Sequence, residues 1–201
     1  MRTILLIAAA SAAVISGAAS AQDTPSDNGT SFRGVRVEGN VGGDRFQSQG
    51  VHNDKLGYGG TVGFDGTIGG RFVIGAEGSY WRANDWTENC TAASNGSTCQ
   101  KSFEEWGAAV RAGALVTPNT LVFAKGGYVN NEQRKRFTTA TGPGSFYDHF
   151  RSDGYQVGGG IEQTITQGRV PAYVNLQYVY SQYSDHTSRQ RLMGGVGIRF
   201  K

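Results

Sequence analysis

The sequence predicts an all-β protein, an eight-stranded antiparallel up-and-down transmembrane β-barrel. Apolar and polar residues alternate with a period of two in eight segments, as expected of strands that have one apolar face. Short and long connections between these segments alternate without exception, which is typical of membrane-spanning barrels with an even number of strands. The chain also begins with an export signal.

Residues 1–21 have the features of a Sec-type signal peptide. Arg2 gives a positive start, residues 4–19 form an apolar run, and Ala19-Ser20-Ala21 fits a cleavage site. The alternative is an N-terminal membrane anchor, but the run is short and weakly apolar for a span of about 20 residues. We expect cleavage after Ala21, a periplasmic lead-in at 22–31 and a barrel domain at 32–201.

Each predicted strand is about ten residues long, the length that a tilted strand needs to cross a bilayer. In the first, at 32–41, Val35 and Val37 share one face while Arg36 and Glu38 share the other. The same alternation recurs at 56–64, 72–80, 106–114, 122–128, 155–162, 170–180 and 192–200. The segment at 122–128 is the least regular, because Phe123 breaks its polar face.

The connections sort into two kinds. Those at 66–70, 117–120 and 166–169 are short and rich in turn residues, whereas those at 42–55, 82–104, 131–153 and 181–190 are longer and polar. We interpret the first set as periplasmic turns and the second as external loops. Lipid offers no water to an open sheet edge, so the sheet must close into a barrel.

The composition fits such a barrel although it resembles that of a soluble protein. Mean hydropathy is −0.38 and charged residues make up 17%, but a barrel needs only one apolar face per strand. Glycine accounts for 31 of 201 residues, about twice the usual share. Net charge is +3 with scattered basic residues, so we expect no nucleic-acid partner.

Aromatic residues near the strand ends predict girdles at the two membrane interfaces. They are Tyr58, Phe64, Phe72, Tyr80, Trp106, Tyr128, Tyr155, Tyr178, Tyr180 and Phe200.

Charged residues on the polar face predict a network inside the barrel. An eight-stranded barrel has an interior just wide enough to be filled by side chains, and buried charges need partners. A plug of ion pairs and an ion gate are both open interpretations, and the narrow lumen favours the plug. The predicted lumen charges are Arg36, Glu38, Glu77, Arg111, Lys125, Glu162 and Arg199.

Cys90 and Cys99 lie in one polar segment. Because an exported protein meets an oxidising compartment, a disulfide between them is the natural interpretation. A metal site needs more ligands, and no histidine lies nearby. We therefore expect no metal and no cofactor.

Four stretches of the sequence carry a family resemblance: GTIGGRFVIGAEGSYW at 66–81, EWGAAVRAGALVTPNTLVFAKGGY at 105–128, GYQVGGGIEQTIT at 154–166 and MGGVGIRF at 193–200. The chain resembles the small eight-stranded outer-membrane β-barrels of proteobacteria, the opacity-protein and outer-membrane-protein-25-like group with a porin-family barrel domain. The resemblance covers nearly all of 32–200. It implies a bacterial outer-membrane location, and an assembly signal at Val196, Ile198 and Phe200 for the barrel-assembly machinery. Lys201 after Phe200 departs from that ending.

The leading functional hypothesis is a non-enzymatic, monomeric barrel, with no catalytic residues, that supports the membrane or presents loops for adhesion or surface binding. Its partners would be outer-membrane lipid and lipopolysaccharide. Two alternatives stay open. One is a narrow channel, and the other is a lipid A deacylase, in which His186 and Ser188 would act as base and nucleophile. The loop aromatics offered for surface contact are Trp86, Phe137, Phe146, Tyr147 and Phe150.

Overall fold

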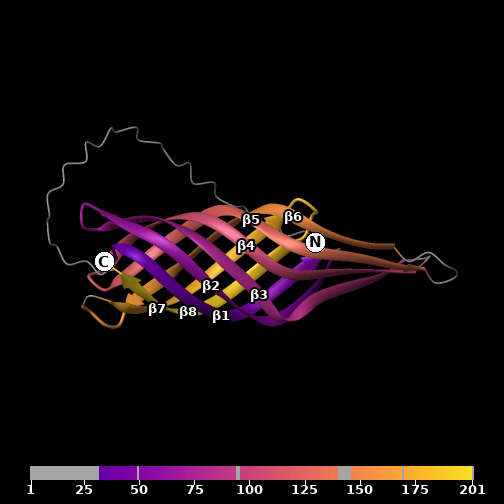
Figure 1. Cartoon of the computed structure of the whole chain (residues 1–201), viewed down its shortest axis with the longest axis horizontal. Helices are drawn as coiled ribbons and strands as arrows, with labels where there is room; N and C mark the ends of the chain where they lie inside the picture. The colour runs from indigo at the N-terminus through magenta and orange to yellow at the C-terminus, as the bar shows by residue number, and fades with distance from the viewer. Residues whose placement is uncertain (1–31, 49, 94–95, 140–145, 169, 201) are drawn as a thin grey trace, which may run out of the picture.

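The computed structural model describes residues 32–48, 50–93, 96–139, 146–168 and 170–200 (Figure 1). The predicted signal peptide, the lead-in at 22–31 and Lys201 lie outside these ranges. The strands are β1 (Gly34–Ser48), β2 (Val51–Ile68), β3 (Phe72–Ala93), β4 (Gly96–Thr117), β5 (Thr120–Thr139), β6 (Phe146–Thr164), β7 (Ala172–Tyr183) and β8 (Ser188–Phe200). Within the described ranges, no helix is long and apolar enough to cross a membrane.

The eight strands form a closed barrel in which each pairs with its sequence neighbours. The last strand, β8, pairs antiparallel with β1, for example at Val37 and Ile198. The predicted eight-stranded up-and-down barrel is therefore confirmed. One end of the barrel, which we call the terminal end, holds Phe200 and the connections at 69–71, 118–119, 165–168 and 170–171.

The prediction of four long loops is wrong, because the strands run on through most of each segment. The segments are 42–55, 82–104, 131–153 and 181–190. Strands β3 and β4 each have 22 residues, about twice the expected length. Beyond the membrane both faces of a strand can be polar. The hydropathy alternation then disappears while the ladder of backbone hydrogen bonds continues.

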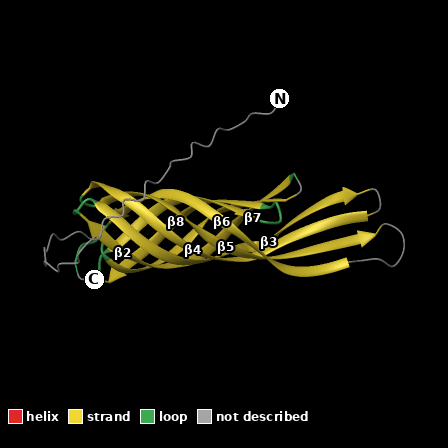
Figure 2. Cartoon of the chain, turned by 90° about the horizontal axis from the view of Figure 1, so that it is seen from above, coloured by secondary structure: helices red, strands yellow, loops and turns green. Residues whose placement is uncertain are grey.

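The extended strands make a second structural part. At the end opposite the terminal end, β3–β6 run past the other four strands (Figure 2). Pairing of β2 with β3 stops at Gly57 and Ala83, and pairing of β6 with β7 starts at Gly154. We call residues 84–93, 96–104, 130–139 and 146–153 the projecting sheet. The side chain of Trp86 is not among those described.

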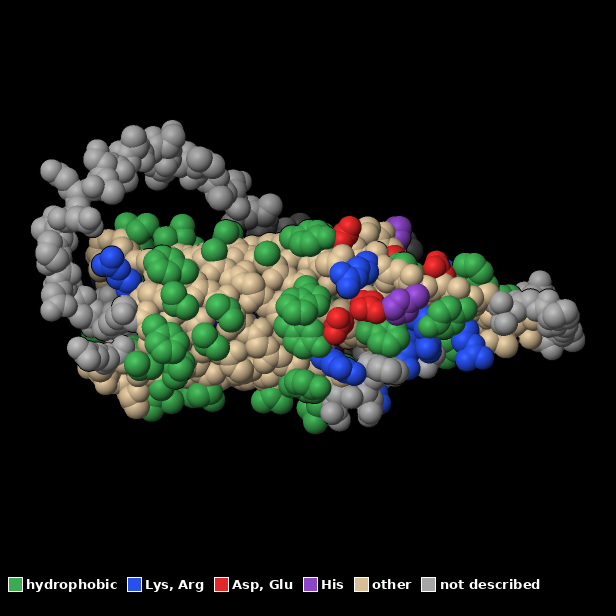
Figure 3. Space-filling view, viewed as in Figure 1, with side chains coloured by type: hydrophobic (Ala, Val, Ile, Leu, Met, Phe, Trp, Pro, Cys, Tyr) green, Lys and Arg blue, Asp and Glu red, His purple; other side chains and the backbone are tan. Residues whose placement is uncertain are grey.

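The outer wall of the barrel is apolar, as the alternation predicts. Val62 is 57% exposed and Val110 is 65% exposed, although both are aliphatic. Aromatic rings gather on the wall below the projecting sheet, where Tyr80 and Trp106 pack with centroids 4.7 Å apart. Figure 3 shows hydrophobic side chains in two bands along the wall. This arrangement matches a surface that faces lipid.

The lumen has an apolar cluster at its terminal end. Phe32, Val73, Leu121 and Phe123 pack there into a buried cluster. This contact explains why Phe123 interrupts the polar face of β5: its ring helps to form an apolar floor. The guanidinium of Arg111 lies 4.9 Å from the centroid of that ring, so the charges start directly above the floor.

Candidate functional site

The seven predicted lumen charges come together in the interior of the barrel. Arg36 on β1 lies 3.3 Å from Glu38 and also pairs with Glu77 on β3. The ammonium of Lys125 on β5 lies 2.8 Å from the second oxygen of Glu77. All four side chains are buried. Through Glu77 the two pairs link β1 to β5 on the opposite side of the barrel, so together they brace the lumen.

The residue at the centre of this network, Asp65, is not among the predicted lumen charges. It is fully buried. Its carboxylate accepts hydrogen bonds from Arg111 at 2.7 and 2.9 Å and from Arg199 at 3.1 Å, and it lies 3.2 Å from Arg36. Glu162 pairs with Arg111 at 3.2 Å and also with Arg199. Four acids thus face four bases in what we call the lower charge cluster: Asp65 and the seven predicted residues.

A second charge cluster, also not predicted, lies nearer the projecting sheet. Arg189 donates to Asp44 at 3.0 Å, and Arg191 lies 2.7 Å from Glu105. All four are buried. The indole of Trp81 donates to Asp44 at 2.9 Å. This upper charge cluster has two acids and two bases, so neither cluster has a net charge.

Polar side chains close the lumen above the upper charge cluster. The Gln100 amide donates to Gln133 at 2.8 Å and to Asp185 at 2.8 Å, and Ser48 donates to Gln100 at 2.6 Å. Gln133 donates to Thr187 at 3.1 Å. These bonds join β1, β4, β5 and the β7–β8 turn. Between the two clusters, a cavity of about 10 Å³ beside Lys125 has room for about one water molecule. Such a filled interior favours a plug over an ion path.

The outer face of the projecting sheet carries cations and aromatic rings in one place. Lys101, Arg134 and His149 stand side by side on β4, β5 and β6. The Phe103 ring lies 5.8 Å from the Lys101 ammonium and 5.9 Å from the Arg134 guanidinium. Arg134 also lies 5.6 Å from the ring of Tyr147. Figure 3 shows these residue types gathered on the projecting part. We call this group, with the exposed Arg136, the basic-aromatic face.

Two exposed carboxylates outside the basic-aromatic face are held as anions. Arg45 donates to Asp54 at 2.6 and 2.8 Å, and these hydrogen bonds lower the pKa of Asp54 below its usual value. Hydrogen bonds from Tyr128 and from Asn130, the latter at 2.7 Å, lower the pKa of Asp153. Both carboxylates are paired with their own neighbours. The carboxylate that contacts the basic-aromatic face is Glu132, which lies 3.0 Å from His149.

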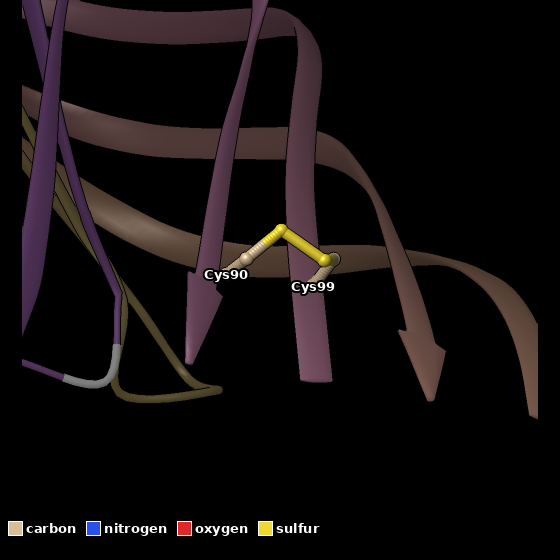
Figure 4. Close-up of a disulfide and its surroundings, with 2 residues drawn as sticks. All are labelled: Cys90 and Cys99. Atoms are coloured by element: carbon tan, nitrogen blue, oxygen red, sulfur yellow. A yellow bond between two sulfur atoms is a disulfide. The ribbon is translucent and has the colours of Figure 1, made fainter. Parts of the chain in front are cut away.

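The predicted disulfide is confirmed. Cys90 on β3 and Cys99 on β4 stand opposite each other in the projecting sheet, as Figure 4 shows. The bridge therefore joins two strands of a hairpin and does not pin a loop, because the predicted loop is itself a pair of strands. It closes a short segment with a sequence separation of 9.

Replacing both cysteines, Cys90→Ala with Cys99→Ala, should loosen the projecting sheet alone. A disulfide that closes so short a segment lowers the chain entropy of the opened hairpin, which stabilises the paired hairpin by about 2–3 kcal/mol. The effect is local to this hairpin. We expect faster amide hydrogen exchange across 87–102, with unchanged exchange in β7 and β8. The reduced wild-type protein is the control and should match the variant. Faster exchange throughout the barrel would contradict the assignment.

The residues of the predicted deacylase pair lie in and beside the β7–β8 turn. His186 is in the β7–β8 turn with a φ of 63°, and Ser188 is the first residue of β8. Across the described residues, no hydrogen bond joins their side chains. Neighbouring Thr187 and Asp185 are instead bound to each other at 2.7 Å. The described residues also contain no group of three or more histidine, cysteine, aspartate or glutamate side chains placed to hold a metal ion.

The residues of the predicted assembly signal lie on the outer wall. Val196 is 62% exposed, Ile198 39% and Phe200 45%. Phe200 stands opposite Val35 on the strand that closes the barrel. Recognition of this ending by the barrel-assembly machinery stays a prediction.

Comparisons with known proteins agree with this architecture. A family model described as outer membrane protein beta-barrel domain matches residues 7–200, and no curated protein matches the chain in sequence. In fold the chain is similar to Ail, the attachment invasion locus protein of Yersinia pestis, both in complex with the heparin analogue sucrose octasulfate and in a second crystal structure. The TM-scores are 0.56 and 0.53, the identities 12% and 14%, and each match covers 84% of this chain and 100% of Ail. Neisserial surface protein A matches with a TM-score of 0.48, 15% identity and coverage of 83% and 97%.

Proposed function

The chain belongs to the outer membrane protein beta-barrel domain family, and from this premise we propose that it is a non-enzymatic surface protein that binds polyanions through the basic-aromatic face. The family agrees with the resemblance in the sequence and points to the bacterial outer membrane. In that membrane the terminal end would face the periplasm, and the projecting sheet would stand outside the cell.

The basic-aromatic face carries this proposal. Arg134 lies between the rings of Phe103 and Tyr147, at 5.9 and 5.6 Å, so its side chain is held in place before a ligand arrives. Preorganised cations lose less entropy when they bind an anion. Aromatic rings beside cations can also pack against the apolar face of a sugar. A sulfated or phosphorylated polysaccharide offers both features.

The fold comparison is consistent with such a ligand. Ail was crystallised with the heparin analogue sucrose octasulfate, a small sugar with many anionic groups. Ail shares only 12% of its residues with this chain, so the proposal rests on the side chains of this chain and takes the compound as a probe.

The test is binding of sucrose octasulfate to the refolded barrel in detergent micelles, measured by titration calorimetry. The double variant Arg134→Ala with Arg136→Ala should weaken binding about thirtyfold, since each charge near a ligand anion contributes about 1 kcal/mol in water. Raising the salt concentration should also weaken binding by the wild type, because salt screens the attraction between the cations and the ligand.

The matched control is Arg33→Ala with Arg71→Ala, which removes two exposed cations at the terminal end. This variant should bind like the wild type. If both double variants bind sucrose octasulfate equally weakly, binding depends only on net charge and the proposal is wrong. An absence of wild-type binding at low salt would also refute the proposal.

A further inference from the structure

His149 is the one histidine of the basic-aromatic face. It lies on β6 opposite Arg134 of β5, and its ring meets the ring of Phe103 edge-on, with centroids 5.5 Å apart. The same Phe103 ring lies beside the Lys101 ammonium and the Arg134 guanidinium. Figure 3 shows histidine beside basic, acidic and hydrophobic side chains on the projecting part. The imidazole is therefore placed among the cations to which we assign polyanion binding.

An acidic side chain holds this imidazole. Nε2 of His149 lies 3.0 Å from Oε1 of Glu132. An ionised carboxylate only accepts hydrogen bonds, so Nε2 carries a hydrogen and donates it to Glu132. The ring nitrogen left to take up a second proton is Nδ1. The side chains of His149 and Glu132 are 43% and 25% exposed, so solvent reaches the pair.

The charged and titratable groups that face His149 come from three strands. Four are cations that stay charged at neutral pH, one is a carboxylate, and one is a phenol that titrates only near pH 10. Protonation of His149 adds a fifth cation beside the carboxylate. The groups are Glu132, Arg134 and Arg136 on β5, Lys101 on β4, and Tyr147 and Arg151 on β6.

Proton uptake and polyanion binding favour each other in this arrangement. Histidine is the side chain that ordinarily gains its charge between about pH 8 and pH 5. A charged imidazole neutralises Glu132, the carboxylate that otherwise repels a ligand anion beside Arg134. Because such coupling is reciprocal, a bound anion in turn favours the protonated imidazole.

We infer that the basic-aromatic face is a pH-dependent site, which takes up a proton at His149 when it binds a polyanion and holds that polyanion most tightly in mildly acidic surroundings. The inference rests on the proposed function and adds its regulation. The Glu132–His149 contact carries it, because this contact places a titrating group and an opposing charge inside the binding face.

The test is titration calorimetry with sucrose octasulfate at constant ionic strength, at about pH 8 and about pH 5.5, which bracket the ordinary titration of histidine. The sulfate esters of this probe stay ionised at both pH values, so a change in affinity belongs to the protein. The wild type should bind about fivefold more tightly at the lower pH, the effect of one further charge about 4 Å from an anion in water. Titrations at about pH 6.5 in two buffers with different ionisation enthalpies should show uptake of part of a proton.

Three variants assign the response to the pair. His149→Asn removes the titrating group, and its affinity should be the same at both pH values. The matched control His52→Asn removes an exposed histidine of β2 outside the basic-aromatic face and should keep the response. Glu132→Gln should bind about fivefold more tightly than the wild type at about pH 8, because the repelling charge is gone. Heat-dependent mobility in electrophoresis identifies the folded protein used in every titration.

The outcomes separate this inference from the proposed function. Equal wild-type affinity at the two pH values would overturn the inference and leave the proposed function standing. A pH response that persists in His149→Asn would also overturn it, since another group would then take up the proton. An absence of wild-type binding at both pH values would refute the proposed function, and the inference with it.

Discussion

Asp65→Asn is expected to lower the free energy of unfolding by about 3–5 kcal/mol, the usual result when one partner of a buried ion pair is removed. The substitution keeps the shape of the side chain and removes its charge. Three arginines of the lower charge cluster, Arg36, Arg111 and Arg199, lie within 3.2 Å of this carboxylate. Without it, four bases face three acids in a closed lumen. Urea unfolding in lipid vesicles, followed by tryptophan fluorescence, measures the change.

Two further variants separate charge balance from general damage. Asp54→Asn removes an exposed carboxylate paired with Arg45, and the unfolding midpoint should stay where it is, because exposed pairs contribute little. Adding Arg199→Met to Asp65→Asn restores equal numbers of acids and bases. The double variant should recover part of the lost stability. If Asp65→Asn and Asp54→Asn behave alike, the lower charge cluster does not stabilise the barrel.

Alternation was sufficient to predict the barrel wall. Every second residue of β2 from Leu56 to Phe64 faces outward in the structure, and Val62 on this face is 57% exposed. A period of two is a local property, readable from neighbours in the chain. It also identified Arg36 and Glu77 as inward, because the face of a side chain follows from its position in the strand.

The ion-pair partners across the lumen could not be predicted from local sequence patterns. Asp65 continues the inward series of Thr61 and Gly63, so following the alternation by one more residue would have found it. Asp44 lies where the hydropathy pattern fades, in a segment interpreted as a loop, and Glu105 lies between such a segment and the next predicted strand. Whether such a segment is strand or loop depends on backbone pairing with a distant strand, as in the opposed Asn131 and Glu105. This pairing leaves no periodic signal when both faces are polar.

The basic-aromatic face could be predicted only as a set of loop residues. The sequence shows a basic run at Arg134-Lys135-Arg136 and separate aromatics. It does not show that Lys101, Arg134 and His149 form one row, because that row depends on the register of three strands. Cross-strand neighbours, unlike alternating faces, are a property of the folded sheet.

Val62→Arg is expected to destabilise the barrel in a bilayer by about 2–4 kcal/mol, the cost of a cation on the lipid-facing wall near the membrane midplane. Val62 points outward from β2, and on the same face it lies between Tyr58 and Ile68, both exposed. If the apolar wall faces lipid, the new guanidinium has no water to solvate it there. The measurement is the urea unfolding curve in vesicles.

The matched control for Val62→Arg is on the same strand and the same face. Leu56 is 68% exposed and lies beyond Tyr58 toward the projecting sheet, outside the aromatic girdle. Leu56→Arg should cost only about 0–1 kcal/mol, because the cost falls toward the interface. The difference between the two variants measures depth in the bilayer rather than tolerance of arginine. Equal costs, or a Val62→Arg barrel as stable as the wild type, would mean that this wall does not lie in hydrocarbon.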